Sequence, residues 1–378
     1  MMKCQQFMAI SLSLLATIGL TAPRWKMGIA LATAGRLANG QIIQIKGEVQ
    51  IERSHGSILS PSPGTSLYPG DQLLTTNGAQ VVVYCADSTP WLVSAGETQL
   101  NRCARETEED KCNSNLVDCP DRGDKIAWSN APIPYLISPR RTALLTTQPT
   151  LRWNRVPGAT SYTVTVEGVT PQGEVVANWT TQVSETQVVY SGESPLNPGV
   201  EYLAIIQANP GASSLDEPSR PGGLHFTVLD HTQAEIVRDK AAEISQQDWE
   251  DSAKALAQVQ LYAENHLIAA AIALLEELVA TGVESAPIYR RLGELYLYEL
   301  ALVPQANTYY TKAVALVDAN DLEEQAAALE GLAQTQLALD QNDAAIRSFN
   351  LALDVYQRLG DGERVKQLET TLGDLINE

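Results

Sequence analysis

The chain has 378 residues, a hydrophobic content of 44% and a formal net charge of −19. This length accommodates two or three domains, and the hydrophobic content is high enough to exclude a disordered chain. The negative charge argues against a sequence-independent nucleic-acid binder, which neutralises phosphates with Lys and Arg, and against docking on anionic lipid. The segment 231–378 holds 25 acidic and 10 basic residues, hence −15 of the −19. We interpret this excess as a solvated acidic surface that keeps the protein soluble.

The N-terminus begins with MMK and continues into an apolar stretch, residues 7–22. A cationic start and an apolar run shorter than the roughly 20 residues of a spanning helix predict a secretory signal peptide over 1–32. The small residues of Ala30-Leu31-Ala32 would allow cleavage there. Arg24-Trp25-Lys26 places positive charge on the side to be translocated, which leaves open an uncleaved anchor to the inner membrane. In both cases we expect an exported protein of the periplasm or cell envelope, whose only membrane contact would be the uncleaved N-terminal segment.

Residues 40–101 consist of short alternating apolar runs separated by Gly, Pro, Asn and Asp, which predicts an all-β domain of about six to eight strands. The run GEVQIER, followed by PGTSLYPGDQLLTTNGAQVVVYCADSTPWLVSAGETQL, resembles the FecR-like domain of bacterial envelope proteins. The resemblance departs from the family at Ser88, where Gly is usual. In the FecR regulator this domain serves sigma-factor signalling through a cytoplasmic N-terminal segment. We expect no such segment here, so only the fold is carried over, and a sensor of envelope state stays as an alternative function.

Four cysteines fall within a 35-residue window: Cys85, Cys103, Cys112 and Cys119. An even number of cysteines in an exported chain predicts one or two disulfides. A four-thiolate zinc site is disfavoured because no CxxC pair occurs among them. The connectivity stays open, although Cys85 lies in a predicted strand and could join a loop cysteine to the sheet. Residues 102–132, polar and acidic, are predicted to be a Cys-containing loop and linker.

Residues 133–229 return to a β-pattern. In SYTVTVE, Tyr162, Val164 and Val166 alternate with polar residues, which is the period of a half-buried antiparallel strand. About seven such runs predict a two-sheet sandwich. The runs PTLRWNRVPGATSYTVTV and PLNPGVEYLAIIQA resemble a fibronectin type III or immunoglobulin-like domain. The resemblance implies that Trp153 is the buried core tryptophan and that Tyr202 forms the tyrosine corner.

Residues 231–378 carry a helical repeat. Leu292-Gly293, Leu332-Ala333 and Leu372-Gly373 recur at 40-residue intervals. A small residue, a large one and a second small or apolar residue then follow at i, i+4 and i+7, which places them on one face of a helix. Three copies of this stripe occur: Ala271/Leu275/Leu278, Ala306/Tyr310/Ala313 and Ala345/Phe349/Ala352.

This pattern resembles the tetratricopeptide repeat, LGxxY followed by AxxxFxxA. The second copy, Ala286 to Asp318, has one residue more than the third, and we place it in the turn Leu302-Val303-Pro304. The last copy ends after its first helix, and such a half-repeat commonly covers the final apolar face. The predicted fold is therefore a multidomain β + α chain: a small all-β FecR-like domain, a fibronectin III/Ig-like β-sandwich and a C-terminal α-solenoid of TPR helix pairs.

The sequence contains no arrangement typical of catalysis. GxSxG, HExxH and Gly-Lys-Ser/Thr motifs do not occur, and the four histidines are spread over separate segments. Paired carboxylates such as Glu276-Glu277 and Glu323-Glu324 are expected on solvated helix faces. We therefore predict a protein that is not an enzyme and has no catalytic residue, metal or cofactor.

What remains is binding. Stacked helix pairs form a groove lined mainly by the first helix of each repeat. The resemblance assigns six residues to it, and a protein or peptide would bind there: Arg290, Glu294, Tyr298, Glu330, Gln334 and Leu337. Arg290 would bind a partner's carboxylate. An alternative is a glycan-binding accessory protein that associates with the cell wall, with Trp179 stacking on sugar.

Overall fold

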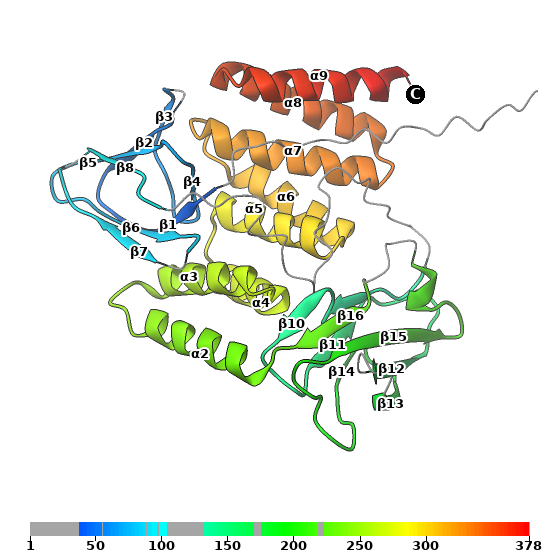
Figure 1. Ribbon diagram of the computed structural model, residues 1–378. Coiled ribbons are helices and arrows are strands. Elements are labelled where there is room, and N and C mark those ends of the chain that lie inside the picture. Colours follow the sequence, from blue (N-terminus) through cyan, green and yellow to red (C-terminus); the bar gives the residue numbers. More distant parts are fainter. Residues whose placement is uncertain are drawn as a thin grey trace, which may run out of the picture.

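The computed structural model describes residues 38–377, except 55, 88, 97, 104–131, 170–174 and 218–222. The predicted signal segment, most of the predicted linker, and the candidate disulfide residues Cys112 and Cys119 lie outside this range. Figure 1 shows three bodies: a small β module formed by the first strands, a stack of helices, and a β-sandwich. No helix in the described range is long and apolar enough to cross a membrane.

The N-terminal β module consists of two four-stranded sheets, in the orders β4-β1-β6-β7 and β3-β2-β5-β8. Ile42, Ile51, Leu73 and Val81 fill the space between the sheets. The strands are β1 (Gly40–Lys46), β2 (Val49–Glu52), β3 (Ile58–Leu59), β4 (Ser66–Leu67), β5 (Gln72–Thr75), β6 (Gln80–Cys85), β7 (Pro90–Val93) and β8 (Thr98–Leu100).

A disulfide joins Cys85, the last residue of β6, to Cys103 after β8, with 5.2 Å between the two Cα atoms. The predicted link between a strand cysteine and a loop cysteine is therefore present for this pair. Both residues are buried in the core of the module. The module thus includes Cys103, which we had assigned to the linker.

The second β body is a sandwich of a five-stranded sheet, β10-β16-β15-β12-β13, and a three-stranded sheet, β14-β11-β9. The strands are β9 (Leu136–Ser138), β10 (Thr142–Leu144), β11 (Thr150–Trp153), β12 (Ser161–Val169), β13 (Val175–Val183), β14 (Gln187–Val189), β15 (Glu201–Asn209) and β16 (His225–Val228). Trp153 and Tyr162 meet edge to face across the core, at a ring-centroid distance of 5.5 Å. The Tyr202 hydroxyl accepts a hydrogen bond from the backbone N–H of Asn197 at 2.6 Å. Trp153 and Tyr202 are therefore both buried in the core, and the Tyr202 hydroxyl binds the backbone five residues upstream.

The helices form antiparallel pairs that stack on one another: α3/α4, α5/α6 and α7/α8, followed by α9 (Figure 1). A further helix, α2, precedes the first pair and packs on α3, and the repeat pattern gave no sign of it. Their bounds are α2 (His231–Ser245), α3 (Asp251–Glu264), α4 (Ile268–Ala280), α5 (Ala286–Glu294), α6 (Val303–Leu316), α7 (Leu322–Ala338), α8 (Asn342–Leu359) and α9 (Gly362–Asn377). All nine residues of the predicted small-large-small stripes are buried.

The extra residue of the second repeat lies elsewhere than predicted. The turns 300–302 and 339–341 have the same length, so the turn of this repeat holds no insertion. The extra residue is instead absorbed in a π-helical segment, Leu295–Glu299, which continues α5. Within it the N–H of Leu300 bonds the carbonyl of Leu295, an i→i+5 bond that takes up one residue more than an α-helical turn.

The N-terminal β module packs along one edge of the helical stack, where the first helices of three successive pairs begin. Gln44 accepts a hydrogen bond from the backbone N–H of Glu250, the residue immediately before α3, at 3.0 Å. The hydroxyl of Ser285, the residue immediately before α5, donates to the carbonyl of Pro63 at 3.3 Å. Arg53 forms an ion pair with Glu323 in the first turn of α7. Ile43, on β1, joins the large helical core.

The sandwich packs on the opposite edge, where the first helices end. The buried side chain of Arg140 donates from Nε to the carbonyl of Leu300 at 2.6 Å. Its two terminal nitrogens bind the carboxylate of Glu217 at 2.9 and 2.7 Å. Thr142 Oγ1 contacts the turn between α3 and α4 and accepts from the N–H of Ala269 at 3.1 Å. The two β bodies therefore hold the same helices at their opposite ends (Figure 1).

Candidate partner-binding surface

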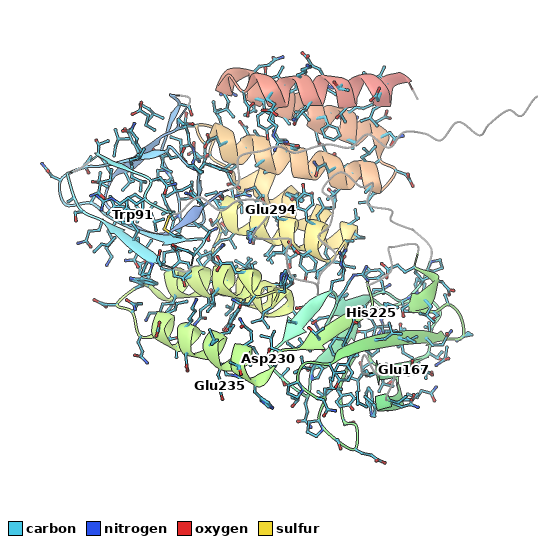
Figure 2. The ribbon with its side chains drawn as sticks, viewed as in Figure 1. Trp91, Glu167, His225, Asp230, Glu235 and Glu294 are labelled. Atoms are coloured by element: carbon cyan, nitrogen blue, oxygen red, sulfur yellow. A yellow bond between two sulfur atoms is a disulfide. The ribbon has the colours of Figure 1, made fainter. Side chains whose placement is uncertain are left out.

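The six predicted groove residues lie on two neighbouring first helices. Arg290 and Glu294 are on α5, Tyr298 is in the π-helical segment that continues it, and the other three are on α7. Figure 2 shows Glu294 on the helical stack, on the side of the N-terminal module. The structure thus brings the predicted residues together, in two groups that differ in their surroundings.

The first group is a row of hydrogen bonds across successive first helices, which we call the polar row: Tyr298, Gln334, Glu330 and Arg364. The hydroxyl of Tyr298 donates to Gln334 Oε1 at 2.6 Å, and Gln334 Nε2 contacts Glu330 Oε1 at 3.5 Å. Arg364 on α9 reaches the same carboxylate at 3.5 Å. Tyr298, Gln334 and Arg364 are half-buried, so the row combines fixed side chains with accessible polar atoms.

Glu330 connects the polar row to the second helix of its own repeat. It is buried, and its second oxygen accepts a hydrogen bond from the hydroxyl of Tyr356 on α8 at 2.7 Å. Burial, followed by the negative charge of Glu330, raises the pKa of Tyr356 well above its ordinary value. Tyr356 therefore stays protonated and donates to Glu330 throughout the physiological range. Leu337, one turn along α7, is half-buried and packs on the core beneath the last helices.

The second group surrounds Arg290 and is turned toward the N-terminal module. Arg290 Nε donates to Glu324 at 2.7 Å, and its Nη1 pairs with Glu294. Burial opposes the positive charge of Arg290, but the carboxylates of Glu294 and Glu324 outweigh it and raise its pKa further above the ordinary value. We predicted that Arg290 binds a partner's carboxylate. In the structure two carboxylates of the same chain already hold the guanidinium.

The pair Glu323-Glu324 corrects a second prediction. We expected it on a solvated helix face, but Glu324 is buried and the Glu323 side chain is only 19% exposed. Both lie where α7 meets the N-terminal module, beside Arg53, which also binds Asp71 at 2.5 Å. Burial, partly offset by Arg53, raises the pKa of Glu323 to about 7. These carboxylates therefore belong to an interface, whereas we had interpreted them as solubilising surface.

Glu276 of the other predicted solvated pair also has specific partners. Its carboxylate accepts hydrogen bonds from the hydroxyls of Tyr296 and Tyr309 at 2.7 and 2.9 Å. The two rings stack at a centroid distance of 5.4 Å. Burial and the Glu276 charge raise the pKa of both tyrosines. This cluster ties α4 to the second repeat.

The glycan-binding alternative rested on an exposed Trp179. The indole is instead half-buried, packs on the sandwich core and meets the Tyr190 ring edge to face at a centroid distance of 5.1 Å. Within the described ranges, no group of three or more His, Cys, Asp or Glu side chains is arranged to hold a metal ion.

Sequence reasoning missed the contact between the N-terminal module and the helices. A signal for it exists in the continuous apolar run Val81 to Tyr84 of β6, since a strand buried on both faces loses the alternation of a half-buried strand. Val81 and Val83 face the interior of the module, whereas Val82 and Tyr84 join the helical core. The run therefore indicated that a second body covers this sheet.

No family model matches the sequence, and no curated protein is similar to it. Solved structures do match. One, described as MamA MSR-1 C2, is 18% identical, with a TM-score of 0.26, and the alignment covers 39% of this chain and 91% of that one. Another, described as YrrB, a TPR protein with an unusual peptide-binding site, is 19% identical, with a TM-score of 0.24, covering 38% of this chain and 80% of that one.

Proposed function

We propose that the protein is a non-enzymatic scaffold of the bacterial cell envelope that binds a protein or peptide partner on the inner face of its helical repeats. The observation that supports this most directly is the polar row, in which side chains of three successive first helices are fixed in a line by their mutual hydrogen bonds. Such a line offers both donors and acceptors to an extended peptide backbone, and its order reduces the entropy lost on binding.

The two β bodies fit this role as supports. We propose that the N-terminal module is FecR-like and that the sandwich is of the fibronectin III or immunoglobulin type, as their sequence resemblances suggest. The Cys85–Cys103 disulfide supports an oxidising compartment outside the cytoplasm, which agrees with the export signal predicted from the sequence. Neither body carries a site of its own in this proposal, and each contacts the helices, the module through Arg53 and the sandwich through Arg140.

The test uses point variants, because deleting residues 231–378 would expose apolar side chains such as Ile43 and Tyr84 that the helices now bury. The variant Y298A/Q334A/L337A removes three side chains of the predicted groove. The matched control, N350A/L351A/Q357A, alters exposed residues on the outer helix α8. Both, with the wild-type chain, serve as baits for chemical cross-linking in envelope extracts, followed by quantitative mass spectrometry.

We expect the groove variant to lose cross-links to its partner at least tenfold, with the control unchanged. Recovery of the same partners in the same amounts by the groove variant would contradict the proposal. Hydrolytic or transfer activity of the purified chain would contradict the non-enzymatic part, and wall binding by the groove variant would favour the glycan alternative.

A further inference from the structure

The five-stranded sheet of the sandwich has one closed edge and one open edge. At the closed edge is β10, where the N–H of Ala143 donates to the carbonyl of His266, in the turn between α3 and α4, at 2.8 Å. At the open edge is β13, which pairs with β12 alone. In an antiparallel pair every second residue turns its N–H and C=O away from the neighbouring strand. In the part of the chain that the structure describes, these groups of β13 have no hydrogen-bond partner.

Length and composition distinguish β13 from the other edge strands of the described sheets. The other seven have two to four residues, whereas β13 has nine. The edge strand with four residues, β7, begins with Pro90, which has no N–H to offer. Edges are commonly protected by short length, proline or charged side chains. The sequence of β13, VVANWTTQV, contains no charged residue, proline or glycine. This strand therefore lacks the features that keep a sheet edge from pairing with another chain.

The outer side chains of β13 leave its backbone edge accessible. Asn178, Thr180 and Gln182 alternate along the exposed face of the strand. The hydroxyl of Thr180 is hydrogen-bonded to that of Thr165 at 3.2 Å, and Gln182 Nε2 donates to the hydroxyl of Ser161 at 2.8 Å. Both partners lie on β12, so these contacts hold the two side chains back over the sheet and away from its edge.

The inner side chains of β13 are only partly covered. Trp179 and Val183 pack on the sandwich core but remain half-buried, and Val175, at the start of the strand, is 64% exposed. A further strand along this edge would cover more of their apolar surface. Tryptophan is also enriched in protein interfaces. The edge thus offers both unpaired backbone groups and apolar side chains to an added strand.

The distribution of charge favours a second copy of the chain as that added strand. Segment 133–229 holds seven acidic and five basic residues, a net charge of −2, whereas the helical segment carries −15. β13 lies on the side of the sandwich away from the helical stack (Figure 1). Glu167 is on β12, one strand back from the edge (Figure 2). Two copies can therefore meet along β13 without opposing like charges, with their acidic helices on opposite sides of the contact.

We propose that two copies of the chain pair antiparallel along β13 and so join their five-stranded sheets into one. The pairing of β13 with β12 is regular from Ala177 to Val183, and Thr180 is its centre. A two-fold axis there sets Thr180 opposite its own copy and Asn178 opposite Gln182, and such polar pairs suit neighbouring strands. One strand pair buries less surface than a standard interface of about 1,600 Å². We therefore expect a reversible dimer with a dissociation constant on the order of micromolar.

The test follows the association of the full chain by sedimentation velocity at protein concentrations from about 1 to about 200 μM. Hydrogen–deuterium exchange of residues 175–183 is measured at both ends of this range. We expect a monomer that converts to a dimer as the concentration rises, and alternate amides of β13 that exchange slower by about tenfold or more in the dimer. The amides already bonded to β12 are the internal reference and should not change.

Variants of Thr180 test the register. T180K sets two lysines opposite each other and should weaken the dimer by about tenfold or more. T180E should do the same, and an equimolar mixture of T180K and T180E should associate again, because opposite charges then meet. Recovery in the mixture also shows that both variants are folded. T150K, at an exposed position on the central strand β11, is the matched control and should dimerise as the wild type does.

A wild-type chain that stays monomeric over the whole range would overturn the proposal. So would a dimer that T180K leaves intact, exchange of β13 that does not depend on concentration, or a mixture that does not recover. Protection of β13 that appears only after envelope extract is added would assign the edge to a different protein, and this result would equally overturn the pairing of two copies. The inference does not depend on the partner proposed for the groove.

Discussion

Tyr310 shows how single residues determine the spacing of the helices. Its ring is fully buried between two helical glycines, Gly293 on α5 and Gly331 on α7. A Cβ atom at Gly331 would stand 2.2 Å from the ring, and one at Gly293 would stand 2.9 Å away. Glycine costs a helix interior up to about 1 kcal/mol relative to alanine. Glycine occupies both positions because any larger residue would collide with the Tyr310 ring, and this collision outweighs the loss of helix propensity.

We therefore expect Gly331→Ala to destabilise the protein by about 1–3 kcal/mol, because overpacking of the Tyr310 ring exceeds the gain in helix propensity. Gly373→Ala is the matched control, since a Cβ atom there meets nothing within 4 Å. It should leave stability unchanged or raise it by up to about 1 kcal/mol. Urea unfolding followed by circular dichroism measures both. A Gly331→Ala variant as stable as the wild type would contradict this account of the helix spacing.

At the scale of elements, the contact between the sandwich and the helical stack depends on a short segment between β9 and β10. Arg140 projects from it into the stack and satisfies the carbonyl of Leu300, at the end of the π-helical segment. Its bidentate partner is Glu217, which directly follows the short 3-10 helix Ser214–Asp216 after β15. The side chain of Glu217 is almost fully buried. One guanidinium therefore joins three elements in a site that water hardly reaches.

Replacing Arg140 by Met should cost about 3–5 kcal/mol, because the Glu217 carboxylate would stay buried without its cation. The double variant R140M/E217Q should recover part of this loss, since it removes the stranded charge. Arg155→Met, at an exposed position of the sandwich, is the control and should change stability by less than about 0.5 kcal/mol. Differential scanning calorimetry measures all three. A loss in R140M no larger than in the control would refute the role of the pair.

The elements also show what sequence patterns can and cannot predict. The stripe of Ala306, Tyr310 and Ala313 was predictable because a helix repeats its faces every 3.6 residues, whatever surrounds it. The place of the extra residue was not, because one residue fits a turn or a π-helical segment equally well in the sequence. Tyr298 of the polar row lies within that segment.

At the scale of the whole molecule, the apolar run of β6 indicates that some other body covers its sheet, but the sequence does not say which body or in what orientation. Local periodicity predicts a sheet or a helix pair, but contacts such as that of Gln44 with Glu250 join residues about two hundred positions apart and leave no periodic signal. The same lack of a local signal explains why the surroundings of Glu323 and Arg290 were predicted wrongly. Their residue types suited a solvated surface and a partner's site, whereas in the structure Glu323 pairs with Arg53 of the module and Arg290 pairs with Glu294 and Glu324 of the helices.

The disulfide is expected to matter for this assembly. It closes a loop with a sequence separation of 18, for which chain entropy predicts a stabilisation of about 3 kcal/mol. Because the module it stabilises contacts three successive helix pairs, C85S/C103S should lower the melting temperature of the module and of the helices together. Thermal unfolding of the wild-type chain and of the variant, both without reductant, measures this. Unaltered helix melting in the variant would show that the bodies unfold independently.

A free solenoid behaves as a spring, because each repeat touches only its neighbours and its curvature changes easily. Here one β body reaches Glu250, Ser285 and Glu323, which begin three successive repeats, and so acts as a splint along the stack. The sandwich fixes the other ends of these helices through Arg140 and Thr142. The curvature of the inner face is thus set before any ligand arrives. A splinted surface selects partners by shape, whereas a free spring would adapt to many.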